Sequence, residues 1–332
     1  MKKFLNRPAS YVDEMLDGLV AAHGDALRLL GDDRRVLARA AGAVPGKVGI
    51  VTGGGSGHLP VFLGYVGEGL LDACAVGNVF AGPRVSDCLL AAQAANGGAG
   101  VLQLYGNYGG DRMNFDMAQE FLSMEGVEVA SVRVADDVAS APPAECHKRR
   151  GVAGMVYAFK IAGACASRGS SLAEVAAVAR KAADACRSIG VALSPCVVPE
   201  SGQASFAISD QEIEFGMGIH GEPGIWRGPM KSADALADEM LDHLLQEIPV
   251  ERRGRVAVLV NSLGATPHEE LYILYRRVVT VLQQRGMTAV MPLVGRYATS
   301  MEMAGASLTL MPLDEELESL LKAPAHCPFW RV

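Results

Sequence analysis

A dense glycine segment directly after a strand-like run constrains this chain more than any other feature of its sequence. Residues 47–52 alternate and carry β-branched side chains, as a buried strand does, and residues 53–58 then read Gly-Gly-Gly-Ser-Gly-His. Glycine tolerates positive φ angles and lets a ligand approach the backbone closely. The segment therefore predicts a tight turn at the carboxyl end of a strand, where open α/β sheets bind their ligands.

This glycine turn matches none of the common glycine motifs. No Gly-Lys-Ser/Thr follows it, as in a nucleotide P-loop, and its spacing is not that of a dinucleotide fingerprint. The Gly-x-Ser-x-Gly elbow of α/β-hydrolases fails at its last position, where His58 stands. A turn whose glycines serve only packing is the alternative, but a histidine at this edge of a sheet favours a ligand site.

Size and charge exclude several classes of protein. The 332 residues exceed the usual size of one hydrophobic core, which predicts two domains. A formal net charge of −7 without a basic stripe argues against a nucleic-acid partner. The sequence has neither the early apolar run of a signal peptide nor an apolar run of membrane-spanning length, so we expect no membrane partner.

The cysteines indicate the cellular compartment. There are seven, scattered along the chain without a Cys-x-x-Cys pair, so a zinc site and a disulfide framework are both disfavoured. Each cysteine is best explained as a small buried apolar residue. We therefore expect a protein of the reducing cytoplasm.

The first predicted domain, residues 1–188, alternates between strands and helices. We expect strands at residues 47–52, 73–76, 100–105 and 127–134 and helices at residues 11–30, 85–96, 114–125, 152–168 and 171–188. This order is typical of a largely parallel sheet flanked by helices, with the loops after its strands gathered at one edge. The glycine turn and the loop after residue 105 should therefore be neighbours.

The second predicted domain, residues 189–332, is an α/β unit with a smaller mixed sheet and helices. We expect strands at residues 189–191, 212–217, 255–261, 287–294 and 307–313 and helices at residues 232–246, 268–285 and 314–322. The tail at residues 324–332 is expected to be irregular. In the first domain, the paired carboxylates Asp136 and Asp137 suggest a metal, but an acidic loop or a helix N-terminus explains them as well, and we predict no metal.

A second histidine has the same setting as His58. Residues 212–224 alternate as a strand and then break at glycines, and His220 stands at the break. A turn histidine bonded to the backbone would explain this position by itself. The repeated pattern, a histidine among glycines at the end of a strand, favours two parts of one site.

With these two segments and a third after residue 105, the sequence resembles the substrate-binding K subunit, or K domain, of the dihydroxyacetone kinase family. The matching blocks keep the family order over nearly the whole chain, and the His-Gly-Glu-Pro-Gly block is highly specific. They comprise residues 53–58, 107–108, 110–111, 114–115, 149–152, 218–224, 261 and 263–267.

The resemblance implies a short-chain ketose held covalently, with its carbonyl carbon joined to the imidazole of His220 as a hemiaminal. Neutral imidazole is an adequate nucleophile near pH 7. The resemblance also implies a phosphotransferase in which His58 and Asp111 hydrogen-bond the substrate hydroxyls and act in proton transfer. Three further residues, Gly55, Ser56 and Gly57, would line the pocket through backbone groups, and Gly106 would lie at its wall.

The resemblance further implies partners. The family's nucleotide, ADP or ATP with Mg²⁺, is carried by a separate helical L subunit or L domain, and no segment here resembles one. The chain should therefore bind no cofactor itself and should be inactive alone as a kinase. Either ATP or a phosphotransferase-system protein could supply the phosphoryl group to the L partner. Family K subunits also form homodimers.

Two departures from the family leave the ketose open. Many relatives that use dihydroxyacetone have a lysine five positions before the aspartate, where this chain has Gly106, and a Ser/Thr-Pro-rich loop where it has residues 81–84, ending in Arg84. The missing side chain should leave room for a tetrulose such as erythrulose. A non-catalytic ketose sensor is a further alternative, but such relatives tend to lose the adduct-forming histidine, which this chain keeps.

Overall fold

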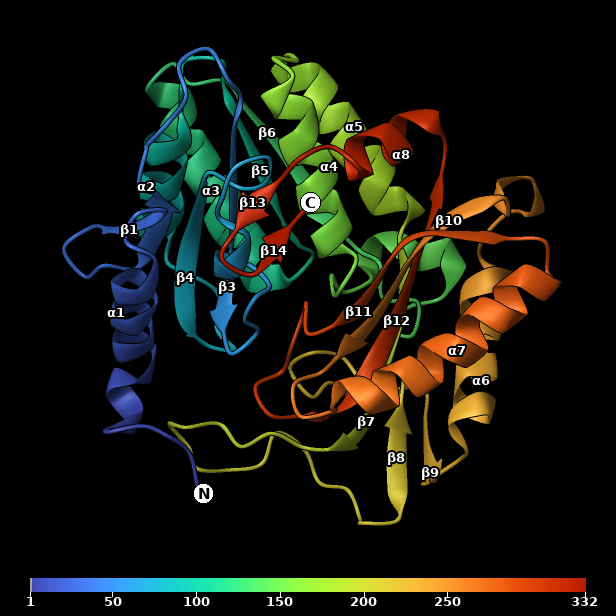
Figure 1. Ribbon diagram of the computed structural model, residues 1–332. Coiled ribbons are helices and arrows are strands. Elements are labelled where there is room, and N and C mark those ends of the chain that lie inside the picture. The colour runs from blue at the N-terminus through green and yellow to red at the C-terminus, as the bar shows by residue number, and fades with distance from the viewer. Residues whose placement is uncertain (1) are drawn as a thin grey trace.

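The computed structural model describes residues 2–332, which form two six-stranded sheets with helices on their faces (Figure 1). In the first sheet the order is β1-β2-β4-β3-β5-β6. Strands β4, β3, β5 and β6 run parallel, whereas β1 and β2 pair antiparallel at one edge. The bounds are β1 (Leu27–Leu30), β2 (Val36–Arg39), β3 (Gly49–Ser56), β4 (Ala73–Val79), β5 (Val101–Gly106) and β6 (Val129–Val134).

Helices cover both faces of this sheet because its strands are buried on both sides. Ile50 and Val51 are successive residues of β3 and point into opposite layers. One layer contains α2 (Val85–Ala95) and α3 (Gly109–Met124). The other contains α1 (Tyr11–His23), α4 (Met155–Ser167) and α5 (Leu172–Ala185).

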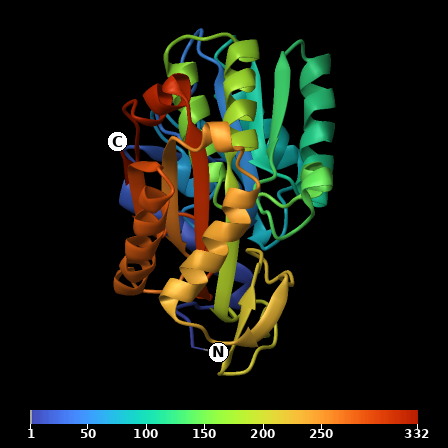
Figure 2. The same cartoon turned by 90° about the vertical axis from the view of Figure 1, so that its right-hand side faces the viewer.

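The second sheet is mixed, with the order β11-β10-β12-β7-β8-β9. Only β10 and β11 pair in parallel. Figure 2 shows α6 (Ala233–Gln246) and α7 (His268–Gln284) side by side over one face. The strands are β7 (Arg187–Ser194), β8 (Glu212–Phe215), β9 (Trp226–Pro229), β10 (Arg255–Ser262), β11 (Thr288–Gly295) and β12 (Ala304–Leu313).

The two halves share a core. One apolar cluster runs from the first sheet through α4 to Ala257 and Leu259 of β10 and to α8 (Glu315–Leu321). The buried Lys160 on α4 donates to the carbonyl oxygen of Leu320 at 2.7 Å. The expected two-sheet α/β fold is confirmed. The second sheet, however, has as many strands as the first and is not the smaller one, and the domain division at residue 188 stays a prediction.

Four local expectations were wrong. Helix α3 begins at Gly109, five residues before the expected start at residue 114, so Asp111 lies on the helix and not in the loop before it. The helix expected over residues 11–30 ends at His23, because the chain turns and Leu27–Leu30 pairs with β2. The tail expected to be irregular forms a small hairpin, β13 (His326–Cys327) and β14 (Trp330–Arg331), which bridges to Glu68. The glycine turn expected from residue 53 starts later: β3 pairs with β4 as far as Ser56, and the backbone turns at Gly57, where φ is +101°.

Packing requires part of the glycine segment. A Cβ atom on Gly54 would lie 2.3 Å from the ring of Phe62, so this strand position accepts no side chain. Short 3₁₀ helices complete the fold at η1 (Pro8–Ser10), η2 (Leu63–Tyr65), η3 (Pro143–Lys148) and η4 (Val250–Arg252). Within residues 2–332, no helix combines the length and the apolar character needed to cross a membrane.

Candidate active site

The two predicted histidines meet although 162 positions of sequence separate them. His58 follows β3 of the first sheet, and His220 lies in the turn after β8 of the second. Their ring centroids are 4.7 Å apart, with the rings perpendicular. The ring of Tyr108, from the loop after β5, lies 4.8 Å from that of His220, and the ring of Phe80 lies 5.5 Å from it. The loops of both sheets thus build one site.

His58 is fixed as a neutral hydrogen-bond acceptor. Its side chain is buried, and Nδ1 lies 2.7 Å from the carbonyl oxygen of Thr299. A carbonyl oxygen only accepts, so Nδ1 carries the proton and Nε2 is left with a lone pair. Nε2 has no hydrogen-bond partner within residues 2–332. Burial, assisted by the neighbouring His220, lowers the pKa of His58 to about 3, so the ring stays neutral at physiological pH.

His220 is oriented by Glu222. Its Nδ1 lies 3.0 Å from Oε1 of Glu222, and its backbone N–H donates to Oε2 at 2.9 Å. Burial would raise the pKa of Glu222, but the hydrogen bond and charge of His220 outweigh it and lower that pKa to about 2. The ionised carboxylate therefore accepts from Nδ1–H, and in the neutral tautomer of His220 this pairing places the lone pair on Nε2, the nitrogen that can act as a nucleophile.

Glycine permits this arrangement. A Cβ atom on Gly218 would lie 2.3 Å from Oε2 of Glu222, so only glycine lets the carboxylate fold back onto the turn. Gly221 adopts a φ of +87°, a conformation that L side chains rarely take. The Gly-x-His-Gly-Glu spacing in the sequence thus has a direct geometric reason.

Asp111 provides a carboxylate poised to titrate near neutrality. It occupies the first turn of α3 and is 7% exposed, and its Oδ1 has no partner among residues 2–332. Burial raises its pKa to about 6, against the opposing effect of His220. A Cβ atom on Gly82 would lie 2.6 Å from Oδ1, so the loop before α2 closes tightly over the carboxylate.

The predicted pocket-lining residues of the glycine segment shape the neighbouring loop. Ser56 donates its hydroxyl to the carbonyl oxygen of Gly77 at 2.8 Å. A Cβ atom on Gly55 would lie 2.8 Å from the backbone nitrogen of Ala81, and one on Gly57 would lie 2.9 Å from the ring of Phe80. These contacts hold the Phe80 loop against β3. Their contact with a ketose stays a prediction.

The expectation that Gly106 leaves room beside the site was wrong. A Cβ atom there would lie 3.2 Å from both the sulfur of Met155 and the ring of Tyr108, so these side chains fill the space. Arg84 does not point a free charge into the site either. Its guanidinium donates to both oxygens of Asp87 at 3.0 and 2.9 Å and also pairs with Asp33.

The paired aspartates are explained without a metal. Asp136 accepts from the backbone N–H groups of Val152 and Gly154, both at 2.7 Å, just before α4. Asp137 pairs with Arg150 at 2.8 Å. The helix-terminus interpretation therefore accounts for Asp136, and residues 2–332 hold no group of three or more potential metal ligands.

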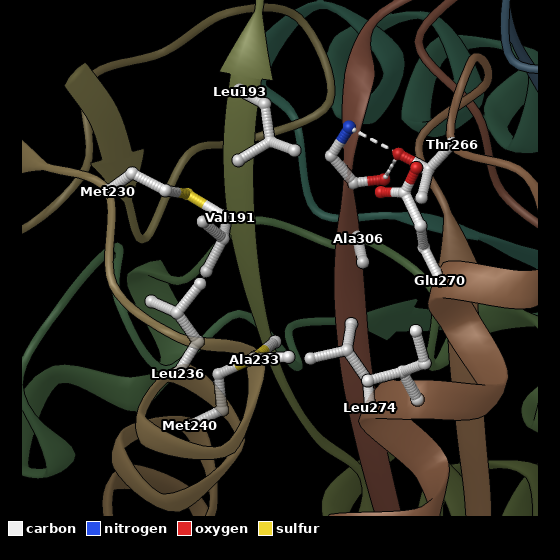
Figure 3. A pocket seen from close by; sticks show the side chains of 12 residues that line it. Val191, Leu193, Met230, Ala233, Leu236, Met240, Thr266, Glu270, Leu274 and Ala306 are labelled. Atoms are coloured by element: carbon white, nitrogen blue, oxygen red, sulfur yellow. Dashed lines mark hydrogen bonds between the residues drawn. The ribbon is translucent and has the colours of Figure 1, made fainter. Parts of the chain in front are cut away.

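A separate hollow is apolar and contains none of the predicted site residues. It measures about 110 Å³ and lies between α6, α7 and the sheet (Figure 3). Aliphatic and methionine side chains line most of it, and the hydroxyl of Thr266 at its edge is already bonded to Gly305. Glu270 is the one ionisable side chain in its lining, so this hollow lacks the groups for ketose chemistry.

Comparison with known proteins decides the family. The model of the Dak1 domain matches residues 17–329. The chain belongs to the Dak1 domain family. It is 43% identical to the dihydroxyacetone-binding subunit DhaK of a PTS-dependent dihydroxyacetone kinase of Listeria innocua, with full coverage of both chains. It is also 43% identical to the L-erythrulose kinase of Pectobacterium atrosepticum, of which it covers 56%.

Solved structures of Dak1-type chains agree. The dihydroxyacetone kinase of C. freundii superposes with a TM-score of 0.90 at 35% identity, and the match covers 99% of this chain and 60% of that one. A dihydroxyacetone kinase operon co-activator superposes with a TM-score of 0.88 at 33% identity, covering 96% and 97%. Kinases and a regulator therefore share this fold, so the fold alone does not distinguish a kinase from a regulator and the residues of the site must do so.

Four site residues escaped sequence reasoning. Thr299 is 241 positions from His58 and lies in no recognised motif. Phe80 has a φ of +58°, a backbone conformation that phenylalanine rarely adopts and that the sequence does not predict. Tyr108 and Glu222 lie inside the recognised motifs but received no role. Glu222 could have been found, because a carboxylate two residues after a candidate nucleophile in a glycine turn is placed to orient it.

Changing Glu222 to glutamine tests this orienting role. We expect ketose adduct formation at His220 to slow about 10-fold or more, because the neutral amide no longer stabilises the positive charge that develops on the ring. Intact-protein mass spectrometry without a reductant, at several ketose concentrations and mixing times, measures the rate. Glu212, at the start of β8, provides the matched control as Glu212→Gln. If the rate of adduct formation at His220 did not change, Glu222 would have no part in forming the adduct.

Proposed function

We propose that this chain is the ketose-binding subunit of a dihydroxyacetone-type kinase. It holds a short-chain ketose as a hemiaminal on His220 while a separate nucleotide-carrying L subunit phosphorylates a substrate hydroxyl. The observation that carries the proposal is the His220–Glu222 pair, which engages Nδ1 of His220 and leaves Nε2 for the substrate, on a ring next to the buried His58. The dihydroxyacetone-binding role named for the L. innocua relative supports it.

The proposed adduct uses the groups in simple steps. Nε2 of His220 adds to the carbonyl carbon, the π electron pair moves to oxygen, and that oxygen takes up a proton to become a hydroxyl. The Glu222 carboxylate stabilises the positive charge on the ring through Nδ1–H. His58 then accepts a hydrogen bond from a substrate hydroxyl, and Asp111 removes a proton from the hydroxyl that attacks the phosphoryl group.

The proposal requires a partner. We expect purified chain with ATP, Mg²⁺ and dihydroxyacetone to form the His220 adduct but no ketose phosphate, because nucleotide binding belongs to the L subunit. Phosphate transfer should appear when the purified nucleotide-carrying subunit is added, and a coupled assay measures it. If calorimetry showed tight ATP binding to this chain alone, the proposal that only the L subunit binds the nucleotide would be wrong. A homodimer and a cytoplasmic location, with no resident cofactor on this chain, complete the proposal.

Two alternatives differ in their evidence. A tetrulose substrate is the first alternative, because the chain is 43% identical to an L-erythrulose and to a D-erythrulose kinase, the same identity as to the L. innocua subunit. Measuring kcat/KM for each ketose decides between them. A regulatory role is the second alternative, because the chain also superposes on the solved structure of an operon co-activator. The retained set of His220, His58 and Asp111 supports the kinase, and a regulator would show no transfer with any nucleotide-carrying subunit.

A further inference from the structure

Helix α3 carries an apolar stripe on its exposed side. The stripe is made of Met113, Met117, Phe121 and Met124, which are 64%, 46%, 45% and 81% exposed. Their spacing of four, four and three residues places them on one side of the helix. The face that packs on the sheet is a different one, made of Asp111, Phe115, Ala118 and Leu122. Four large apolar side chains in one exposed row mark an interaction surface.

The stripe leads directly to the candidate active site. Asp111 lies in the first turn of the same helix, two residues before Met113. Asn114 donates to the carbonyl oxygen of Pro83 at 2.7 Å, which ties the helix to the loop that closes over Asp111. The 16 residues of α3 span about 24 Å. A protein seated on the stripe would therefore sit beside the carboxylate.

Charges along the stripe indicate the partner's chemistry. Asp116 and Glu120 are exposed beside it, and neither forms a salt bridge or side-chain hydrogen bond within residues 2–332. Together with Met124 they line a shallow hollow on this surface. Arg112 is the one exposed cation of α3, so two copies of this acidic chain meeting here would bring mostly like charges together, which disfavours self-association. A partner with an apolar face and lysine or arginine side chains at its edge fits.

We propose that the α3 stripe is the docking surface for the nucleotide-carrying subunit. This inference rests on the proposed function, because a phosphoryl donor must be brought next to Asp111. Kinase relatives support the need for such an arrangement: this chain covers only 56–60% of the erythrulose kinases and of the C. freundii kinase, so their chains hold a further part. Docking on α3 aligns that donor with the base at the start of the helix.

The test compares two pairs of exposed apolar residues. Met117→Ser with Phe121→Ser removes the centre of the stripe, and Tyr272→Ser with Ile273→Ser, 57% and 48% exposed on α7, is the matched control. Calorimetry measures the Kd for the purified nucleotide-carrying subunit of the same organism. We expect it to rise at least 10-fold for the stripe variant and to stay unchanged for the control. Glu120→Lys should also weaken binding, and ketose trapping on His220 should stay normal throughout.

The outcomes separate the two proposals. If wild type binds the subunit and the stripe variant binds equally well, the docking surface is wrong while the proposed function stands. If wild type forms no ketose adduct or binds no nucleotide-carrying subunit, the proposed function fails, and the docking proposal fails with it. A stripe variant that changes the oligomeric state in sedimentation instead of subunit affinity would assign the stripe to a second copy and overturn the proposal.

Discussion

Replacing His220 by alanine should abolish both the covalent ketose adduct and phosphoryl transfer. In the neutral tautomer that Glu222 favours, the lone pair of His220 lies on Nε2, and His58 is a poor replacement because burial lowers the pKa of its ring to about 3. Losing the covalent anchor also removes the positioning that makes the reaction effectively intramolecular, so we expect transfer to fall by about 10⁴-fold or more. Intact mass of the chain incubated with ketose and a coupled assay with the L subunit measure the two effects.

An exposed histidine supplies the control for this experiment. His268 begins α7 and lies outside the group of residues around His220, so His268→Ala should keep both adduct and activity. The hemiaminal assignment fails if the His220→Ala chain still gains the mass of the ketose. His58→Ala provides a second comparison: it should keep the adduct at His220 and slow the transfer, because it removes an acceptor without removing the nucleophile.

The sequence predicted most of the fold because the relevant information is local. Alternating apolar patterns placed α2, α6 and α7 to within one or two residues, and β-branched runs located nine of the twelve strands of the two sheets but missed β1, β2 and β9. The prediction of a turn from Gly53 onward was wrong because tertiary contacts, and not the glycines, determine where β3 ends. Gly53 to Ser56 extend β3 because β4 pairs with them and Phe62 packs onto Gly54, and neither contact can be read from the glycines themselves.

The site was predictable as a set of residues but not as an environment. His58, Asp111 and His220 each lie in a motif, so sequence reasoning could place them together. The environment that tunes them comes from distant segments. Thr299 fixes the tautomer of His58, and Met155 of α4 fills the space beside Gly106 that was expected to stay open. No spacing rule connects such positions, because only the packed fold brings them into contact.

Changing Asp111 to asparagine should separate binding from transfer. The amide keeps the size of the carboxylate, so the His220 adduct should form at its normal extent. Phosphoryl transfer should slow by about 10²–10⁴-fold, because an amide cannot take the proton of the attacking hydroxyl. Glu125→Gln, at the far end of α3, makes the equivalent carboxylate-to-amide change away from the site and should leave the transfer rate unchanged.

The pH dependence provides an independent signature of this base. Burial raises the pKa of Asp111 to about 6, and the base acts only when ionised. Wild-type transfer should therefore be full above that pKa and decline as the pH falls through about 6. The low residual rate of Asp111→Asn should lack this decline, since the amide does not titrate. If the variant kept the same acidic limb, the limb would belong to another group, and Asp111 would not be the base that accepts the hydroxyl proton.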